Sequence, residues 1–229
     1  MEIIYAIALG LLQGLTEFLP VSSSGHLVLL QNYLGMTEPE LLLDISLHLG
    51  TLSAICAVFY REIISIISTI FRMPALYKKA GSFRELIENN IDVRISVFII
   101  IGSIPTALIG LFFHQIADQI FGSVRIAGIM LLITGTFLWF TRYVGLSGRS
   151  LARMKSSDAV MVGIVQGLAI LPGISRSGST ISAALFLGID REVSGRYSFL
   201  LSVPAILGAM ILEVQSSFGQ TSVPIAMIL

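Results

Sequence analysis

The sequence predicts an all-α integral membrane protein, a polytopic helical bundle with inverted repeats and two re-entrant or broken helix pairs. Three observations predict this fold class. Of the 229 residues, 55% are hydrophobic and only 12% are charged, whereas an ordinary soluble domain carries about 25% charged residues. The hydrophobic residues form long runs, as membrane helices require. Two polar, turn-forming segments with nearly the same sequence interrupt those runs, and such segments are costly in a membrane unless they line a shared cavity.

The two similar segments are Gln13–Gly25, QGLTEFLPVSSSG, and Gln166–Gly178, QGLAILPGISRSG. They predict an internal duplication within a single membrane domain over residues 1–229, with one repeat at about 1–113 and the other at about 124–229. A weaker pair of matching segments, SIPTALIG at Ser103–Gly110 and SVPAILGA at Ser202–Ala209, also favours duplication.

The apolar stretches account for the chain in order. The first, Ile3–Leu30, is too long for one straight span and is broken by Pro20 and the serines after it, so we expect a re-entrant pair. The stretch Ala159–Gly188 is broken in the same way by Pro172 and predicts a second pair. A last run, Val223–Leu229, is too short to span and is expected to be an incomplete helix. Four uninterrupted stretches have the length of single spans: Leu41–Tyr60, Ile95–Phe113, Val124–Phe140 and Tyr197–Glu213.

Basic residues gather on alternate connections, which predicts the orientation, because cytoplasmic connections are enriched in Lys and Arg. The connections at 31–40, 114–123 and 216–222 carry no basic residue and are expected outside. The two repeats then enter from opposite faces, and their tips meet near the middle of the membrane. Zero formal net charge gives no reason to expect nucleic-acid binding. The basic connections carry Arg61, Arg72, Lys78, Lys79, Arg84 and Arg94; Arg142, Arg149, Arg153 and Lys155; and Arg191 and Arg196.

An acidic residue, Glu17, lies within the first apolar stretch. Inserting such a residue costs about 2.5–3.5 kcal/mol, so it normally has a partner or faces a cavity. Gln13 lies four residues earlier, on the same face of a helix. Amide and carboxylate oxygens are ligands that Mg²⁺ or Ca²⁺ prefers, and Mg²⁺ usually shares them with a substrate phosphate. The alternative is a buried Glu17 that bonds only to Gln13 and the backbone.

The first tip, Pro20–His26, reads PVSSSGH and predicts an anion-binding helix start. Proline ends one helix and serine caps the next. The free N–H groups and the positive dipole end of the new helix attract phosphate. Ser22, Ser23 and Ser24 add donors, and Gly25 allows close approach of the backbone. Helix capping alone would explain one of the serines.

The second tip, Pro172–Thr180, reads PGISRSGST. Arg176 is the one basic residue that falls in the middle of a predicted membrane segment, and serines and a glycine surround it, which is the composition of a phosphate clamp. Its position in the middle of the segment argues against a snorkelling side chain. An ion pair with Glu17 across the repeat is the other structural reading and does not exclude phosphate binding. His48, in LHLGT, is expected to pack in the core.

At these residues the chain closely resembles the undecaprenyl-diphosphate phosphatase family, the bacitracin-resistance type. The family's Glu/Gln-x-x-x-Glu motif matches Gln13–Glu17, its Pro-Val-Ser-Ser-x-Gly-His stretch matches Pro20–His26, and its Pro-Gly-x-Ser-Arg-Ser motif matches Pro172–Ser177. The resemblance implies hydrolysis of a C55 polyprenyl diphosphate to the monophosphate, which recycles the lipid carrier for cell-wall glycan synthesis. It also implies a requirement for Mg²⁺ or Ca²⁺, a plasma-membrane site open to the outer side, and a homodimer.

We therefore expect a phosphatase in which either Ser23 attacks, with His26 or Glu17 taking its proton, or His26 attacks and forms a phosphohistidine. The rival hypothesis is an inverted-repeat transporter or flippase for an anionic or phosphorylated lipid. Such a carrier has little need of a carboxylate in its anion site. The expected catalytic residues are Glu17, Ser23, His26 and Arg176; the expected substrate contacts are Ser22, Ser24, Gly25, Ser175, Ser177 and Thr180; the expected metal ligands are Gln13 and Glu17.

Overall fold

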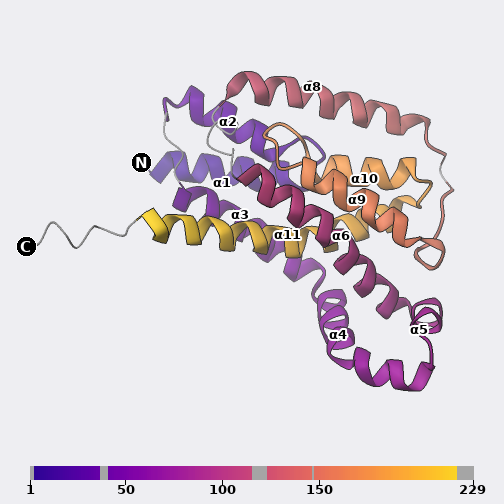
Figure 1. Cartoon of the computed structure of the whole chain (residues 1–229). Helices are drawn as coiled ribbons and strands as arrows, with labels where there is room; N and C mark the ends of the chain where they lie inside the picture. The colour runs from indigo at the N-terminus through magenta and orange to yellow at the C-terminus, as the bar shows by residue number, and fades with distance from the viewer. Residues whose placement is uncertain (1–2, 37–40, 115–122, 146, 221–229) are drawn as a thin grey trace, which may run out of the picture.

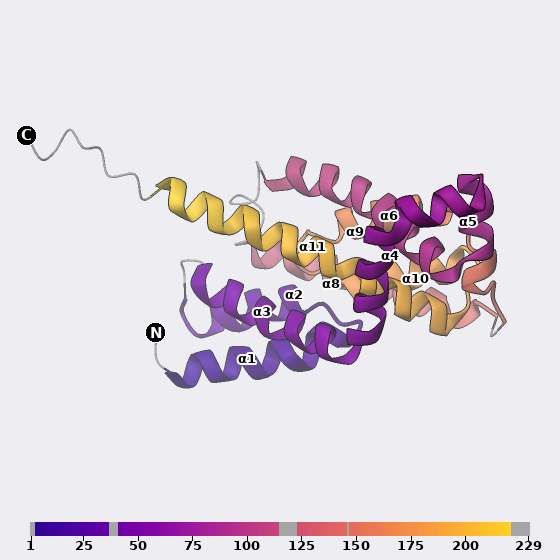
Figure 2. The same ribbon diagram turned by 90° about the horizontal axis from the view of Figure 1, so that it is seen from below.

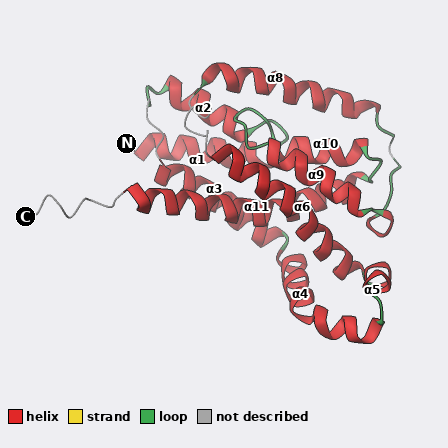
Figure 3. Cartoon of the chain, viewed as in Figure 1, coloured by secondary structure: helices red, strands yellow, loops and turns green. Residues whose placement is uncertain are grey.

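The computed structural model describes residues 3–36, 41–114, 123–145 and 147–220, and within these residues the fold is a bundle of α-helices (Figures 1 and 3). One isolated parallel bridge, between Arg149 and Ile189, is the β-type pairing among them. The prediction of an all-α fold is confirmed. The helices are α1 (Ile3–Phe18), α2 (Ser23–Tyr33), α3 (Leu41–Val58), α4 (Tyr60–Ala80), α5 (Phe83–Asn89), α6 (Ile91–His114), α8 (Val124–Phe140), α9 (Ser156–Leu168), α10 (Arg176–Phe186) and α11 (Arg191–Gln220), with short 3₁₀ turns at Thr141–Tyr143 and Leu151–Arg153.

Three of the described helical segments are long and apolar enough to cross a membrane: Ile91–Phe113, Val124–Tyr143 and Arg191–Leu212. Many of their large apolar side chains point away from the protein; Leu132, for example, is 74% exposed. Contiguous apolar surface of this kind is rare on soluble monomers, and here it suits a hydrocarbon environment. The expected spans at 95–113, 124–140 and 197–213 all fall within these helices.

The predicted span Leu41–Tyr60 corresponds to helix α3, but the chain that follows it is helical and not an irregular connection. Helix α3 stops at Val58, and the chain bends by 84° into α4, which is itself helical to Ala80. We expected this basic stretch to be a connection, yet α4 and α5 form a helical lobe beside the bundle (Figures 1 and 2). Gly81, with φ of 71°, ends α4 in the left-handed conformation that glycine adopts without strain.

Both expected broken pairs are present. Helices α1 and α2 form one hairpin and α9 and α10 form the other, and Figure 1 shows the two hairpins opening toward opposite ends of the bundle. A serine caps the second helix of each hairpin in the same way: Ser22 accepts a hydrogen bond from Gly25 N at 3.3 Å, and Ser175 accepts one from Gly178 N at 3.1 Å. This likeness supports the predicted inverted repeat, which stays a prediction.

Helix α9 is held in close contact with α6. A Cβ atom added at Gly163 would lie 2.1 Å from the Gly102 carbonyl oxygen, so the two backbones touch where the helices cross. Thr106 of α6 donates a hydrogen bond to Gly163 O at 2.8 Å. Small residues commonly permit such crossings in membranes, where packing and interhelical hydrogen bonds replace the hydrophobic driving force. This contact fixes the second hairpin within the main core.

The tips of the two hairpins interlock. A Cβ atom at Gly25 would lie 2.9 Å from Gly173 Cα of the other hairpin, and one at Gly178 would lie 3.1 Å from Pro20 Cβ. Helix α8 braces the second tip, because Thr134 donates to Gly173 O at 2.9 Å. The two loops therefore meet inside the bundle, as predicted. The expected incomplete helix at 223–229 lies outside the described residues.

Candidate active site

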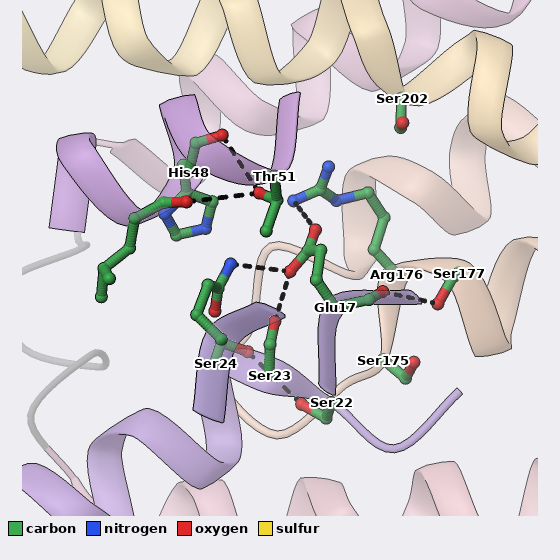
Figure 4. Close-up of polar contacts among 12 residues, drawn as sticks. Glu17, Ser22, Ser23, Ser24, His48, Thr51, Ser175, Arg176, Ser177 and Ser202 are labelled. Atoms are coloured by element: carbon green, nitrogen blue, oxygen red, sulfur yellow. Dashed lines mark hydrogen bonds and ion pairs between the residues drawn. The ribbon is translucent and has the colours of Figure 1, made fainter. Parts of the chain in front are cut away.

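The carboxylate of Glu17 is the centre of a group of polar side chains from both tips (Figure 4). Ser23 Oγ donates to Glu17 Oε2 at 2.5 Å, and Gln13 Nε2 donates to the same oxygen at 3.0 Å. Arg176 Nη2 lies 3.3 Å from Glu17 Oε1. Only 9% of the Glu17 side chain and 23% of the Arg176 side chain are exposed. An acid, a hydroxyl and a guanidinium thus meet in a mostly buried place, as expected, whereas the imidazole of His26, which was expected with them, bonds to the Ser22 carbonyl instead.

The repeat explains why these groups meet. Ser23 is the first residue of α2 and Arg176 is the first residue of α10, and these two positions align when the repeated segments are superimposed. Each hairpin therefore brings a helix N-terminus to the tip, where free N–H groups and the dipole favour an anion. The first repeat places a hydroxyl there and the second a guanidinium. Gln13 and Glu17 are one turn apart on α1 and so face the same side.

Ser22, which precedes Ser23, has an unusual backbone conformation. Its φ is 66°, in the left-handed region, which costs a residue other than glycine about 1–2 kcal/mol. His26 Nδ1 lies 2.8 Å from the Ser22 carbonyl oxygen. Since a carbonyl only accepts, Nδ1 carries the proton, and a neutral His26 has its free lone pair on Nε2. Within the described residues, this is the hydrogen bond that the His26 ring makes. The ring therefore supports the Ser22–Ser23 peptide and does not bond to Glu17.

A small cavity adjoins Glu17 and Arg176. Its volume is about 10 Å³, which is about the space that one water molecule needs. The cavity as it stands therefore has no room for a phosphate group beside the Glu17–Arg176 ion pair. The polar wall of the cavity is formed by Glu17, Arg176, Ser177, Ser198 and Ser202, and the apolar wall by Phe18, Ile55 and Phe199.

A larger cavity, of about 230 Å³, lies at the basic end of the bundle, beside α4. It contains Arg61 and Arg196 together with Glu62 and Asp92, so its charges balance, and Arg196 Nη2 lies 3.7 Å from Glu62 Oε1. No residue of the two tips lines it. Of these two cavities, the small one is therefore the one lined by residues of the two tips.

The remaining predicted site residues have various positions. Ser177 lines the small cavity and donates to Glu17 O at 3.4 Å. Ser24 joins the tips by accepting from Gly173 N at 3.4 Å. Ser175 is the buried cap of α10. Thr180 is fully buried, and its hydroxyl faces α10 and α11.

Three further residues of the surroundings were not predicted as site residues. Ser198 and Ser202 of α11 line the small cavity. With Ser194 they form a stripe of buried serines at a spacing of four along an apolar helix; such a stripe faces the bundle interior, and this signal could have identified them. His48 of α3 lies beside the Glu17 group in Figure 4, so core packing is not its whole environment.

The donor set fits a hard divalent cation. Gln13 is 1% exposed, and its Oε1 has no hydrogen-bond partner although it is buried next to a carboxylate. Oxygen ligands of this kind suit Mg²⁺ or Ca²⁺. Within the described part of the chain no three His, Cys, Asp or Glu side chains gather around a common point. A cation held by Gln13 and Glu17 would therefore take its other ligands from substrate phosphate and water.

Comparison with known proteins gives a consistent result. Residues 6–229 match the family described as "Bacitracin resistance protein BacA". A protein of Desulfatibacillum aliphaticivorans named undecaprenyl-diphosphatase is 55% identical over 97% of this chain and 81% of its own length. Proteins of the same name from Desulforapulum autotrophicum and Methanosphaera stadtmanae are 50% and 41% identical, over 96% and 94% of this chain and 79% and 78% of their own lengths.

Proposed function

This chain belongs to the bacitracin resistance protein BacA family, and we propose that its site hydrolyses undecaprenyl diphosphate to the monophosphate and inorganic phosphate. The protein is a membrane phosphatase. Its relatives carry the name of this activity at up to 55% identity, and the site holds the groups that phosphate hydrolysis needs. The comparisons give no support to the rival hypothesis of a transporter or flippase.

The observation that carries the mechanism is the 2.5 Å hydrogen bond from Ser23 Oγ to the Glu17 carboxylate. In the first step Ser23 Oγ attacks the terminal phosphorus, and its proton passes to Glu17 Oε2. The bond from that phosphorus to the bridging oxygen breaks, and undecaprenyl monophosphate leaves. An adjacent base that activates a hydroxyl nucleophile is a recurring arrangement in covalent catalysis.

In the second step water attacks the phosphorus of phosphoserine. The Ser23 oxygen leaves and takes the proton from Glu17, and one proton of the water passes to Glu17 and then to solvent. The products are hydrogen phosphate and the free hydroxyl. His26 is a bracing residue in this scheme, because its ring bonds to the Ser22 carbonyl and not to the nucleophile.

Arg176 and the two helix N-termini hold the phosphates. The guanidinium pairs with Glu17 Oε1 in the resting site, while Ser23 donates to Oε2, and it is released for phosphate as Glu17 takes the Ser23 proton and loses its charge. Preorganised donors that face developing charge usually supply the largest share of catalysis. When bound, Mg²⁺ or Ca²⁺ would neutralise phosphate charge and polarise the bond that breaks. Gln13 and Glu17 would be its protein ligands.

We place the site open to the outer side of the plasma membrane. The lobe α4–α5, the connection between α8 and α9, and the turn between α10 and α11 share one end of the bundle in Figure 1, and these segments carry most of the basic residues. Basic connections favour the cytoplasm, and the α1–α2 hairpin opens at the other end. The prenyl tail would lie in lipid beside the helices. A homodimer is part of the proposal on the resemblance alone.

Trapping of the covalent intermediate tests the nucleophile. Purified protein in detergent is mixed with substrate labelled at the terminal phosphate and quenched within milliseconds. We expect the label on Ser23, and we expect Ser23→Ala to lose it and to lower kcat by about 10³-fold or more. His26→Ala should keep the label. A label on His26 would contradict the mechanism. Release of no phosphate by the unchanged protein, with Mg²⁺ or Ca²⁺ and without EDTA, would contradict the function itself.

A further inference from the structure

Thr180 is fully buried one turn after the start of α10, and its hydroxyl has three neighbours. It donates to Arg176 O at 2.7 Å and lies 3.3 Å from Ser177 O. Its third neighbour is Ser198 Oγ of α11, at 2.5 Å. Ser198 is itself only 2% exposed. A hydroxyl that is surrounded in this way has no free donor left for a substrate.

Counting protons fixes the direction of these bonds. A threonine hydroxyl has one proton, and a carbonyl oxygen can only accept. The proton of Thr180 therefore goes to the nearer carbonyl, that of Arg176. Ser198 must then donate its own proton to Thr180 Oγ1. The result is a continuous relay from α11 through Ser198 and Thr180 to the backbone of Arg176.

The relay of hydrogen bonds ends at the backbone of Arg176, the residue whose side-chain direction matters most for the proposed phosphate binding. Arg176 begins α10, so a small rotation of the first turn of that helix moves the guanidinium at the end of a long side chain. Ser198 lines the same cavity as Arg176 and Glu17, so α11 is the opposite wall of the place where phosphate must enter. We propose that Ser198 is a positioning residue for Arg176, which acts through Thr180 and so sets the affinity of the site for phosphate. This inference rests on the proposed function of Arg176 as the phosphate clamp.

Affinity for inorganic pyrophosphate, measured by calorimetry with the full chain in detergent and EDTA, is the direct readout. Loss of one internal hydrogen bond is expected to weaken binding about three- to tenfold in Ser198→Ala. Thr180→Val should weaken it equally, and Thr180→Ser, which keeps the hydroxyl, should bind as the unchanged protein does. KM for the lipid substrate should rise by the same factor.

The matched control is Ser194→Ala. Ser194 is buried on the same helix one turn before Ser198, and its hydroxyl donates to Ile189 O at 3.4 Å, away from the site. It should leave pyrophosphate affinity unchanged. Both variants should have similar midpoints of thermal unfolding, so that a change in affinity is not a change in folding.

A double-mutant cycle decides whether Ser198 acts through Arg176. In an Arg176→Ala background, Ser198→Ala should change pyrophosphate affinity and kcat/KM by less than about twofold, because the guanidinium that it positions is gone. An equal loss in both backgrounds, or affinity unchanged in Ser198→Ala alone, would overturn the proposal. The phosphatase activity of the unchanged protein is measured in parallel, and its absence would refute the proposed function independently of the cycle.

Discussion

Glu17 is the residue on which the site depends, because one carboxylate serves three partners. Its Oε1 faces Arg176, and its Oε2 accepts from both Gln13 and Ser23. In this structure it pairs with the guanidinium that we propose as the phosphate clamp. In the proposed mechanism Glu17 therefore competes with the substrate for Arg176 and also serves the reaction as a base. These two roles can be separated by experiment.

Glu17→Gln should separate them, because it removes the charge and keeps the shape. We expect kcat to fall by about 10²–10⁴-fold, the usual contribution of a general base. We expect affinity for pyrophosphate in EDTA to rise, by about five- to tenfold, because the anion that competes for Arg176 is gone. Calorimetry and phosphate release on one preparation measure both. Glu62→Gln, at the ion pair with Arg196 in the larger cavity, is the control and should change neither. Unchanged or weaker pyrophosphate binding by Glu17→Gln would contradict the competition.

The motifs predicted the meeting of Glu17, Ser23 and Arg176, because the repeat and the proline breaks place each of them at a hairpin tip. They could not predict how side chains turn within a tip. Serine is uncommon at positive φ, so the strained backbone of Ser22 gives no sequence signal. Thr180 was expected at the substrate, yet its hydroxyl faces α11, because the position of α11 depends on packing that a motif does not encode. The assignment of roles to these residues stays a prediction.

At the scale of elements, the first helices of the two hairpins, α1 and α9, carry glycine at matching positions but differ in how closely other helices pack against them. When the repeats are aligned, Gly10 of α1 corresponds to Gly163 of α9, and Gly14 corresponds to Gly167. On α9 both glycines touch α6, whereas a Cβ at Gly10 would meet only Leu47 Cδ2, at an ordinary 3.7 Å, and one at Gly14 would meet nothing within 4 Å. The same sequence position is therefore tightly packed in one repeat and open in the other.

Gly163→Ala should accordingly destabilise the protein, since the new methyl group would overlap the Gly102 carbonyl oxygen. Overpacking of this kind costs about 1–3 kcal/mol, which lowers the midpoint of thermal unfolding by about 2–4 °C per kcal/mol in a chain of this size. Gly10→Ala is the matched control and should leave the midpoint unchanged or raise it, because alanine favours a helix over glycine by about 1 kcal/mol. Equal midpoints for the two variants in detergent would show that α6 and α9 do not cross in backbone contact.

The bounds of a helix could be predicted from the sequence where the cap and the apolar run agreed. Helix α8 has the predicted bounds, Val124–Phe140, because Ser123 caps its start and the apolar run sets its length. Helix α4 differs from the prediction, because its basic residues are typical of a connection between membrane spans. Its apolar residues recur at the helical spacing of three and four, at Ile63, Ile66, Ile67 and Ile70, and this period was the better signal.

At the scale of the whole molecule, most basic residues lie at one end of the bundle, although the formal net charge is zero. The α4–α5 lobe and the two connections that share its end in Figure 1 carry arginine and lysine. Arg125, at the start of α8, is the exception at the other end. The positive-inside tendency thus agrees with the arrangement of helices in space, which hydropathy alone does not determine. The orientation that follows is the part of the proposal that the sequence supports and that an accessibility experiment can test.

Cysteine labelling in intact cells tests the orientation, because Cys56 is the chain's single cysteine and can be replaced by alanine. In that background, Tyr33→Cys places a thiol at the end of α2, where the native side chain is 86% exposed. Lys79→Cys places one in the last turn of α4, in the basic lobe. A maleimide that cannot cross membranes should label the first and spare the second until the cells are permeabilised. Labelling of Lys79→Cys alone in intact cells would show that the protein has the opposite orientation in the membrane. The α1–α2 hairpin would then receive its lipid diphosphate from the other side.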